Sequence, residues 1–145
     1  MTEIRQLKDF PQYAPILAFW AFREWYGNRS IDFNLVMNAY QDRINNDKPP
    51  MTWIAIERTM PVGMVTLKTN DLWSRKDLNP WLASLFVLPE YRKRGTGKNL
   101  IDVAIKGASY LEHKILYLFI DANNKVLYNY YTRMGWNYVL KTCFP

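Results

Sequence analysis

The first fifty residues carry apolar side chains at the three- and four-residue spacing of helices. One helix is expected from Tyr13 or Pro15 to Trp25, where a glycine–asparagine pair follows. A second helix is expected to begin at Ser30 or Asp32, because either side chain can accept a hydrogen bond from the first turn. It should end within the asparagine- and proline-rich stretch before residue 51.

Shorter apolar runs predict strands. Glu3–Leu7 is the first, and Thr52–Glu57 and Val62–Lys68 lie on either side of a short turn, which predicts a hairpin. A polar loop then leads to Trp81–Val87, expected to be the central strand. Ile115–Ile120 is continuously apolar, as is typical of a strand covered on both faces.

The last third of the chain adds two more helices. An apolar stripe with steps near four residues runs from Leu100 to Leu111 and predicts a helix that begins after two glycines. Another helix is expected from a cap at Asn123 or Asn124 to Gly135, a residue suited to the left-handed position after a helix. Trp136–Thr142 is the last expected strand. The order β-α-α-β-β-β-α-β-α-β predicts one mixed α/β (α+β) domain over residues 1–145.

Length and composition restrict the possible classes of protein. A chain of 145 residues with 49% hydrophobic residues can bury one substantial core. Its start lacks an apolar signal segment, and its apolar runs are shorter than the ~20 residues of a membrane span, so we expect a cytoplasmic protein. The chain contains one cysteine and one histidine, which argues against an internal disulfide or a cysteine-based metal site; no metal is expected.

The formal net charge of +6 predicts an anionic partner. Positive charge is densest between Arg92 and Lys98, where it coincides with a glycine turn instead of forming a stripe along a helix. This placement argues against nucleic acid as the partner.

That turn lies within Leu85–Leu100, which reads as a strand, a basic turn with Gly95 and Gly97, and the start of a helix. Glycines let the backbone bend so that successive N–H groups approach one anion. The helix N-terminus adds unpaired donors and a positive dipole end. The segment is thus expected to bind a group such as pyrophosphate, although it matches neither the P-loop nor the G-x-G-x-x-G pattern.

Two motifs together resemble the GCN5-related N-acetyltransferase (GNAT) superfamily. The first is Arg92-x-x-Gly95-x-Gly97 after an apolar strand, which resembles the acyl-CoA-binding motif. The second is Asn124, then Tyr131 seven residues on, then Gly135 and an aromatic residue. Nearly the whole chain looks like a bacterial subgroup of these enzymes, and this likeness does not identify the acceptor. The resemblance implies the GNAT fold, a central mixed sheet flanked by helices, here short of its final strand.

The resemblance also implies an activity and a site. The expected reaction is direct transfer of an acetyl group from acetyl-CoA to the primary amine of a small molecule. Tyr131 would donate a proton to the departing CoA sulfur, since an unperturbed tyrosine is protonated at neutral pH. The residues expected to bind CoA are Leu85, Phe86, Val87, Arg92, Lys93, Arg94, Gly95, Thr96, Gly97, Lys98 and Asn124.

The acceptor side is less defined by the sequence. Many relatives carry a glutamate on the central strand, but residues 81–84 contain no carboxylate. Glu24, Glu57 and Asp71 remain candidates for a base, alongside water. Aromatic residues are candidates for lining an acceptor pocket or for the core: Trp20, Trp25, Tyr26 and Trp73.

Three alternatives stay open at this point. The acceptor could be a protein or peptide amine, which would need an open groove, or the protein could be an acyl-CoA sensor without catalytic activity. Loss of the final strand would leave Ile115–Ile120 with an unpaired edge. Trp136–Phe144 is therefore expected to pair with this strand, either in its own chain or in a twofold homodimer.

Overall fold

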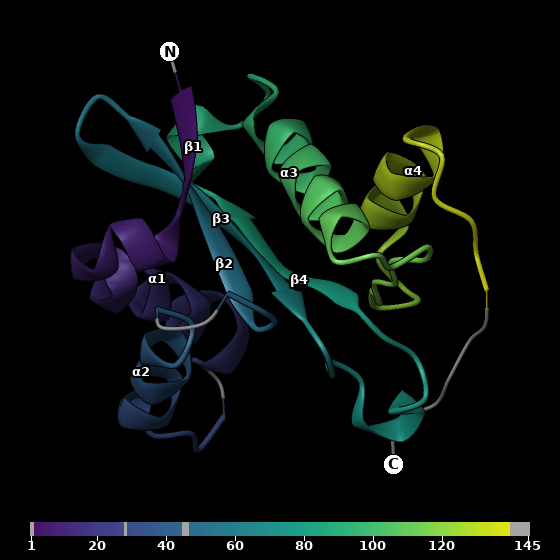
Figure 1. Cartoon of the computed structure of the whole chain (residues 1–145), viewed down its shortest axis with the longest axis horizontal. Helices are drawn as coiled ribbons and strands as arrows, with labels where there is room; N and C mark the ends of the chain where they lie inside the picture. Colours follow the sequence, from purple (N-terminus) through teal and green to yellow (C-terminus); the bar gives the residue numbers. More distant parts are fainter. Residues whose placement is uncertain (1, 28, 45–46, 140–145) are drawn as a thin grey trace.

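A computed structural model of the protein describes residues 2–27, 29–44 and 47–139. Helices cover both faces of a single sheet (Figure 1). The mixed α/β class expected from the sequence is confirmed. In chain order the elements are β1 (Thr2–Gln6), α1 (Ala14–Ala21), α2 (Phe33–Gln41), β2 (Met51–Glu57), β3 (Met60–Lys68), β4 (Trp81–Val87), α3 (Thr96–Tyr110) and α4 (Lys125–Arg133).

The four strands form an antiparallel sheet in the order β1-β2-β3-β4. Two expectations are therefore wrong for the described residues: the sheet is not mixed, and Trp81–Val87 lies at its edge instead of its centre. The predicted hairpin is confirmed: β2 and β3 pair from Met51↔Leu67 to Glu57↔Met60 around a tight turn in which Arg58 has a φ of 60°. β4 pairs with β3, and the register shifts between Met64 and Thr66. This shift is a β-bulge, and it lies next to the candidate site.

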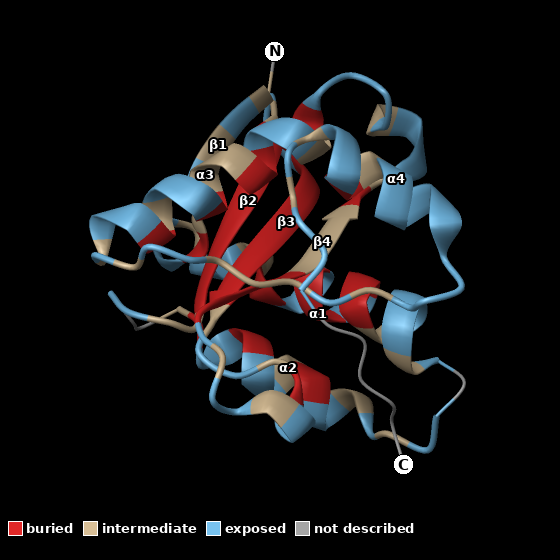
Figure 2. Ribbon diagram, turned by 90° about the vertical axis from the view of Figure 1, so that its right-hand side faces the viewer, coloured by how far each residue is buried: buried red, intermediate tan, exposed pale blue. Residues whose placement is uncertain are grey.

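The core is divided between the two faces of the sheet. One buried cluster joins α1 and α2 to the sheet and includes Leu17, Tyr40 and Ile54. The other joins α3 and α4 to the opposite face and includes Trp53 and Leu100. Because both faces are covered, β2 and β3 are buried along nearly their whole length (Figure 2).

The helix boundaries follow local capping signals. Asp32, and not Ser30, caps α2: its carboxylate accepts a hydrogen bond from the Asn34 N–H at 2.9 Å. α1 continues through a π-helical turn, Phe22–Tyr26, one residue beyond the expected end. After α4, Gly135 has a φ of 96°, and the N–H of Trp136 donates to the carbonyl of Tyr131 at 3.1 Å. These are features of a Schellman cap, so the predicted left-handed role of Gly135 is confirmed.

The predicted strand Ile115–Ile120 does not form. Within the described residues, the segment makes one isolated parallel bridge to β4, in which Tyr117 accepts from the Leu82 N–H at 2.7 Å and donates to the Pro80 carbonyl at 3.0 Å. Its apolar character instead reflects packing, since Leu116, Leu118 and Ile120 lie against the cluster shared by α3 and α4. An apolar run indicates burial but does not by itself specify a strand.

The last predicted strand, Trp136–Thr142, is not formed at its described residues, 136–139. The rest of that segment lies outside the described residues. Pairing of Trp136–Phe144 with the same or a second chain therefore stays a prediction, as does the homodimer.

Gly107 in α3 allows the helix to approach the sheet closely, which gives a first testable prediction. A Cβ added at Gly107 would lie 2.7 Å from the Cη2 atom of Trp53, whose ring is buried. Overpacking of this kind costs about 1–3 kcal/mol, more than the gain in helix propensity, so Gly107→Ala is expected to lower the free energy of unfolding measured in urea. Ser109→Ala, at an exposed position on the same helix, is the control; equal stability of both variants would contradict the close packing.

Candidate active site

The loop between β4 and α3 leads into the N-terminus of α3 at the glycine turn. Lys93 and Gly95 have left-handed φ values of 63° and 85°, and Gly95 is the N-cap of α3 without a side chain to cap it. The N–H groups of the first helical turn have no acceptor within a helix. They therefore form a set of donors for an anion, as the glycine turn predicted, although the binding of CoA there stays a proposal.

Gly97 differs in detail from the sequence-based expectation. It lies inside the first turn of α3 and is not in the left-handed region; Gly95 is. Glycine is needed at position 97 because there is little room for a side chain: a Cβ there would lie 3.2 Å from the Tyr130 hydroxyl and 3.9 Å from a methyl group of Val87. Gly97 thus lies where α3, α4 and the end of β4 approach one another.

The four cations of the loop do not share one role. Arg92 is tied to the strand: its Nε donates to the Val87 carbonyl at 2.8 Å, and its guanidinium lies 5.6 Å from the centre of the Phe86 ring. The guanidinium of Arg94 lies 5.1 Å from the centre of the Tyr91 ring, and the Nζ of Lys98 lies 3.3 Å from a carboxylate oxygen of Asp102. Lys93 is exposed. All four residues are exposed, but only Arg92 is bonded to β4, so Arg92 fixes the loop against the strand.

β4 contains an extra residue next to this loop. Ala83 pairs with Thr66 and Phe86 with Met64, so Ser84 and Leu85 together face the single residue Val65. Ser84 has a φ of 55°, the left-handed conformation of a bulge residue. Beyond the bridge to Tyr117, the outer edge of β4 has no strand partner among the described residues. The outer backbone edge at Leu85–Val87 is thus open next to the glycine turn, apart from the Val87 carbonyl, which accepts from Arg92.

The side chains after the bulge alternate between the two clusters. Leu85 and Val87 pack on the side of α3 and α4, whereas Phe86 packs on the side of α1, 5.5 Å from Trp20 and 6.4 Å from Trp25 between ring centres. The backbone of β4 therefore lies between two sides of the candidate site, one facing α3 and α4 and the other facing α1.

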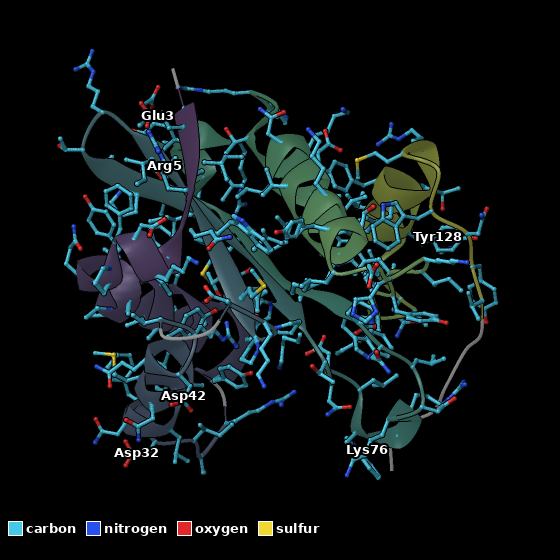
Figure 3. The ribbon with its side chains drawn as sticks, viewed as in Figure 1. Glu3, Arg5, Asp32, Asp42, Lys76 and Tyr128 are labelled. Carbon is cyan, nitrogen blue, oxygen red and sulfur yellow. The ribbon has the colours of Figure 1, made fainter. Side chains whose placement is uncertain are left out.

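Tyr131 is the buried tyrosine of α4. Its ring contacts those of Tyr130 and Trp136 edge-on, and burial raises its pKa far above the usual range. The side chain therefore keeps its proton at any working pH. Its hydroxyl makes no hydrogen bond within the described part of the chain. Tyr130 is only partly buried, and Tyr128 lies on the outer side of α4 (Figure 3).

Asn124 caps α4, with its side-chain oxygen accepting from the Leu127 N–H at 3.1 Å. This confirms the predicted cap. Its contact with the pantetheine arm stays a prediction.

On the opposite face of the sheet, a cavity of about 240 Å³ opens between α2 and β4. Of the aromatic candidates, Tyr26 lines it, whereas Trp20 is buried in the core and Trp73 is 62% exposed. Trp25 packs against Phe86. The cavity is lined by Ala21, Tyr26, Ile31, Leu35, Val36, Ala39, Tyr40, Arg43, Lys68, Asp71 and Ser84.

Asp71 is the candidate base that the structure brings to this cavity. Glu24 is exposed on the last turn of the first helix, and Glu57 lies at the far end of β2. Burial raises the pKa of Asp71, while Lys68, 3.2 Å away, and Arg43 act in the opposite direction. A carboxylate with a raised pKa accepts a proton more readily than an ordinary aspartate.

The pKa of Asp71 leads to a second prediction. Because its folded pKa exceeds the unfolded value of 3.8, the folded state binds the proton more tightly, and stability should fall as pH rises from 3.8 through the folded pKa. Asp71→Asn removes this group and should flatten that part of the pH profile of unfolding free energy. Asp9→Asn, at an exposed site, is the control, and an Asp71→Asn profile as steep as that of the parent protein would refute the assignment.

Sequence reasoning missed several residues of this cavity. Arg43 lies in the turn just after α2 and follows Val36 and Tyr40 at helical spacing, so its place on their buried side could have been found from the apolar pattern. Lys68 and Ser84 carry no comparable signal, because their positions depend on the bulge and on the loop after β3.

Two kinds of feature are absent from residues 2–27, 29–44 and 47–139. No three side chains of His, Cys, Asp or Glu gather there as metal ligands would. No helix in these ranges is both long and apolar enough to cross a membrane.

Solved structures share the fold. AAC(6')-Iy in complex with the bisubstrate analogue CoA-S-monomethyl-acetylneamine is 18% identical with a TM-score of 0.81, and the match covers 100% of this chain and 97% of that chain. A GCN5-related N-acetyltransferase from Ralstonia eutropha JMP134 is 21% identical with a TM-score of 0.68, covering 100% and 98%. The aminoglycoside 6'-N-acetyltransferase AAC(6')-Ih from Acinetobacter baumannii is 15% identical with a TM-score of 0.73, covering 99% and 96%.

No curated protein matches the chain significantly. The family model of the acetyltransferase (GNAT) family matches residues 8–136, which include the glycine turn, Asn124 and Tyr131. The chain therefore belongs to the acetyltransferase (GNAT) family and is an acetyl-CoA-dependent acetyltransferase, as its two motifs predicted.

Proposed function

We propose that this enzyme moves the acetyl group of acetyl-CoA directly to the primary amine of a small molecule. The observation that carries the proposal is the arrangement around β4. The glycine turn and Tyr131 lie on the side of α3 and α4, and a half-open cavity lies on the side of α2. The bulge at Ser84 interrupts the strand between them. Two reactants bound on either side would meet at the backbone of this strand, and alignment of that kind can supply much of the rate.

The side of β4 that faces α3 and α4, which we call the donor half, has the charge and the free backbone donors to bind CoA. Free N–H groups in the first turn of α3 can donate to the pyrophosphate, with Gly95, Thr96 and Gly97 forming the approach. Lys93, Arg94 and Lys98 add positive charge near it. The open backbone edge of Leu85–Val87 can pair with the amide groups of the pantetheine arm, and Asn124 is a further candidate contact.

The chemistry follows from these positions. The neutral amine nitrogen forms a bond to the acetyl carbon, and the bond from that carbon to sulfur breaks. The proton lost by the nitrogen passes to Asp71, directly or through water. The Tyr131 hydroxyl donates a proton to the leaving sulfur and is then reprotonated from solvent. A backbone N–H at the bulge can stabilise the carbonyl oxygen as charge develops on it.

Two observations favour this proposal over its alternatives. A cavity of about 240 Å³ has room for a small acceptor. Asp71 supplies a carboxylate that β4 lacks, which weakens the case for a sensor without catalytic activity. Similar structures include acetyltransferases that act on aminoglycosides, which are small-molecule amines. At their low sequence identity, these structures support a shared fold and do not identify the substrate.

An acetyl-CoA consumption screen tests the proposal. Amino acids, polyamines, aminoglycosides and short peptides are offered as acceptors, and acetyl-CoA binding is measured by calorimetry in parallel. Turnover with a small amine supports the proposal. Turnover with peptides alone would identify a peptide acetyltransferase, and acetyl-CoA binding without turnover on any acceptor would identify a sensor.

A further inference from the structure

The cavity on the side of α2 carries more positive than negative charge. Its charged lining residues are Arg43, Lys68 and Asp71, that is, two cations and one carboxylate. Lys68 and Asp71 form an ion pair at 3.2 Å. The charge of Arg43 is therefore the excess in this cavity.

Arg43 is held rigidly and away from water. Its side chain is 7% exposed, and its Nη1 donates to the Thr66 hydroxyl at 2.9 Å. Thr66 in turn shares a hydrogen bond of 2.8 Å with Thr52. The guanidinium lies 4.1 Å from the centre of the Tyr40 ring. Among the described residues Arg43 makes no direct ion pair: the charge of Arg43 lowers the pKa of Asp71, but the carboxylate of Asp71 pairs with Lys68.

A buried cation without a carboxylate partner is costly, and an anion brought by a ligand would offset that cost. The planar guanidinium suits a carboxylate, which can accept two of its N–H groups. A polycationic acceptor would place further positive charge beside Arg43 and Lys68, where the low dielectric strengthens repulsion.

The remaining walls indicate the rest of the acceptor. Ile31, Leu35, Val36 and Ala39 form an apolar side of the cavity. We infer that the acceptor is an amino acid with an apolar side chain, whose carboxylate pairs with Arg43 while its amine faces the bulge in β4. This inference rests on the proposed function and names its substrate class.

Matched amines test the inference. Leucine, leucinamide, isopentylamine, spermidine and O-phosphoethanolamine are compared by kcat/KM at one acetyl-CoA concentration. Leucine is expected to exceed leucinamide and isopentylamine by about ten- to a hundredfold, the value of a hydrogen-bonded charge pair. The amide has the more readily deprotonated amine, so a preference for leucine would run against intrinsic reactivity.

Two variants locate the source of the preference. Arg43→Lys keeps the charge but loses the planar fork, and it should raise the KM for leucine about tenfold and the KM for leucinamide by less, so that the ratio of the two falls. Lys68→Gln should reduce the preference for leucine as well, since it removes one of the two cations. Lys76→Gln, in the loop between β3 and β4 and well apart from α2 (Figure 3), removes the same charge elsewhere and should have no effect. Thermal melts of all variants confirm folding.

The outcomes separate the inference from the proposed function. Acetylation of spermidine or isopentylamine at least as fast as leucine would overturn the amino-acid assignment and leave the acetyltransferase function standing. Faster acetylation of O-phosphoethanolamine than of leucine would show that the cavity prefers a phosphate to a carboxylate, and this result would also overturn the amino-acid assignment. A protein that fails to use acetyl-CoA with any amine would refute both.

Discussion

A Gly97→Val variant is expected to remain folded and to lose acetyl-CoA binding, with the affinity reduced at least roughly a hundredfold, or about 2.7 kcal/mol. The reason is steric. Gly97 lies in the first turn of α3, where the donor N–H groups must reach an anion, and even a Cβ there would come within 3.2 Å of the Tyr130 hydroxyl. A valine adds two methyl groups to that space. Calorimetry with acetyl-CoA measures the loss.

A pair of milder changes separates the two possible causes of that loss. Gly97→Ala introduces only the Cβ, and adding Tyr130→Phe removes the hydroxyl that the Cβ would approach. If the loss arises from contact with CoA, the double variant stays as weak as Gly97→Ala. Recovery in the double variant would show that the two helices were pushed apart, and unchanged affinity in folded Gly97→Val would remove the argument for an anion site.

The second large effect is expected from Tyr131→Phe. Turnover should fall about ten- to a thousandfold, in kcat and kcat/KM alike, because only the proton donor to the leaving sulfur is removed. The affinity for acetyl-CoA should change little. Stability should also be nearly unchanged, since the hydroxyl makes no hydrogen bond in the described part of the chain and the ring packing is kept.

Tyr128→Phe is the matched control, because Tyr128 lies on the same helix and is 45% exposed. It should leave turnover as it is. If Tyr131→Phe is equally active, Tyr131 is a packing residue of the core and the proton comes from solvent.

The parts of the site that depend on local chemistry could be predicted from the sequence. The caps at Asp32 and Asn124 and the left-handed Gly135 arise from hydrogen bonds and φ preferences within a few residues. The glycine turn is equally local, and the order of its strand and helix was predicted correctly. Only the roles of the glycines differed, since the left-handed φ belongs to Gly95 and the close contact to Gly97.

The parts that depend on distant pairing could not be predicted. Ile115–Ile120 has the composition of a strand, but a strand also needs a partner along its edge, and one bridge to Trp81 is all that the described residues provide. The bulge at Ser84 arises from the register between β3 and β4. The cavity requires α2, the end of β3 and this bulge together, so Arg43 and Asp71 meet there without any shared sequence motif.

The division of the core has a consequence for how this protein can change over time. The cluster under α1 and α2 and the cluster under α3 and α4 contact opposite faces of the sheet. Leu88 is a side chain that packs against both clusters; substitutions away from it that reshape one cluster act at a distance from the other, and distant sites contribute to stability almost independently. Substitutions in α1 and α2 can therefore change the acceptor preference while the acetyl-CoA side under α3 and α4 stays the same. Related proteins could in this way use different acceptors with one common acetyl-CoA site.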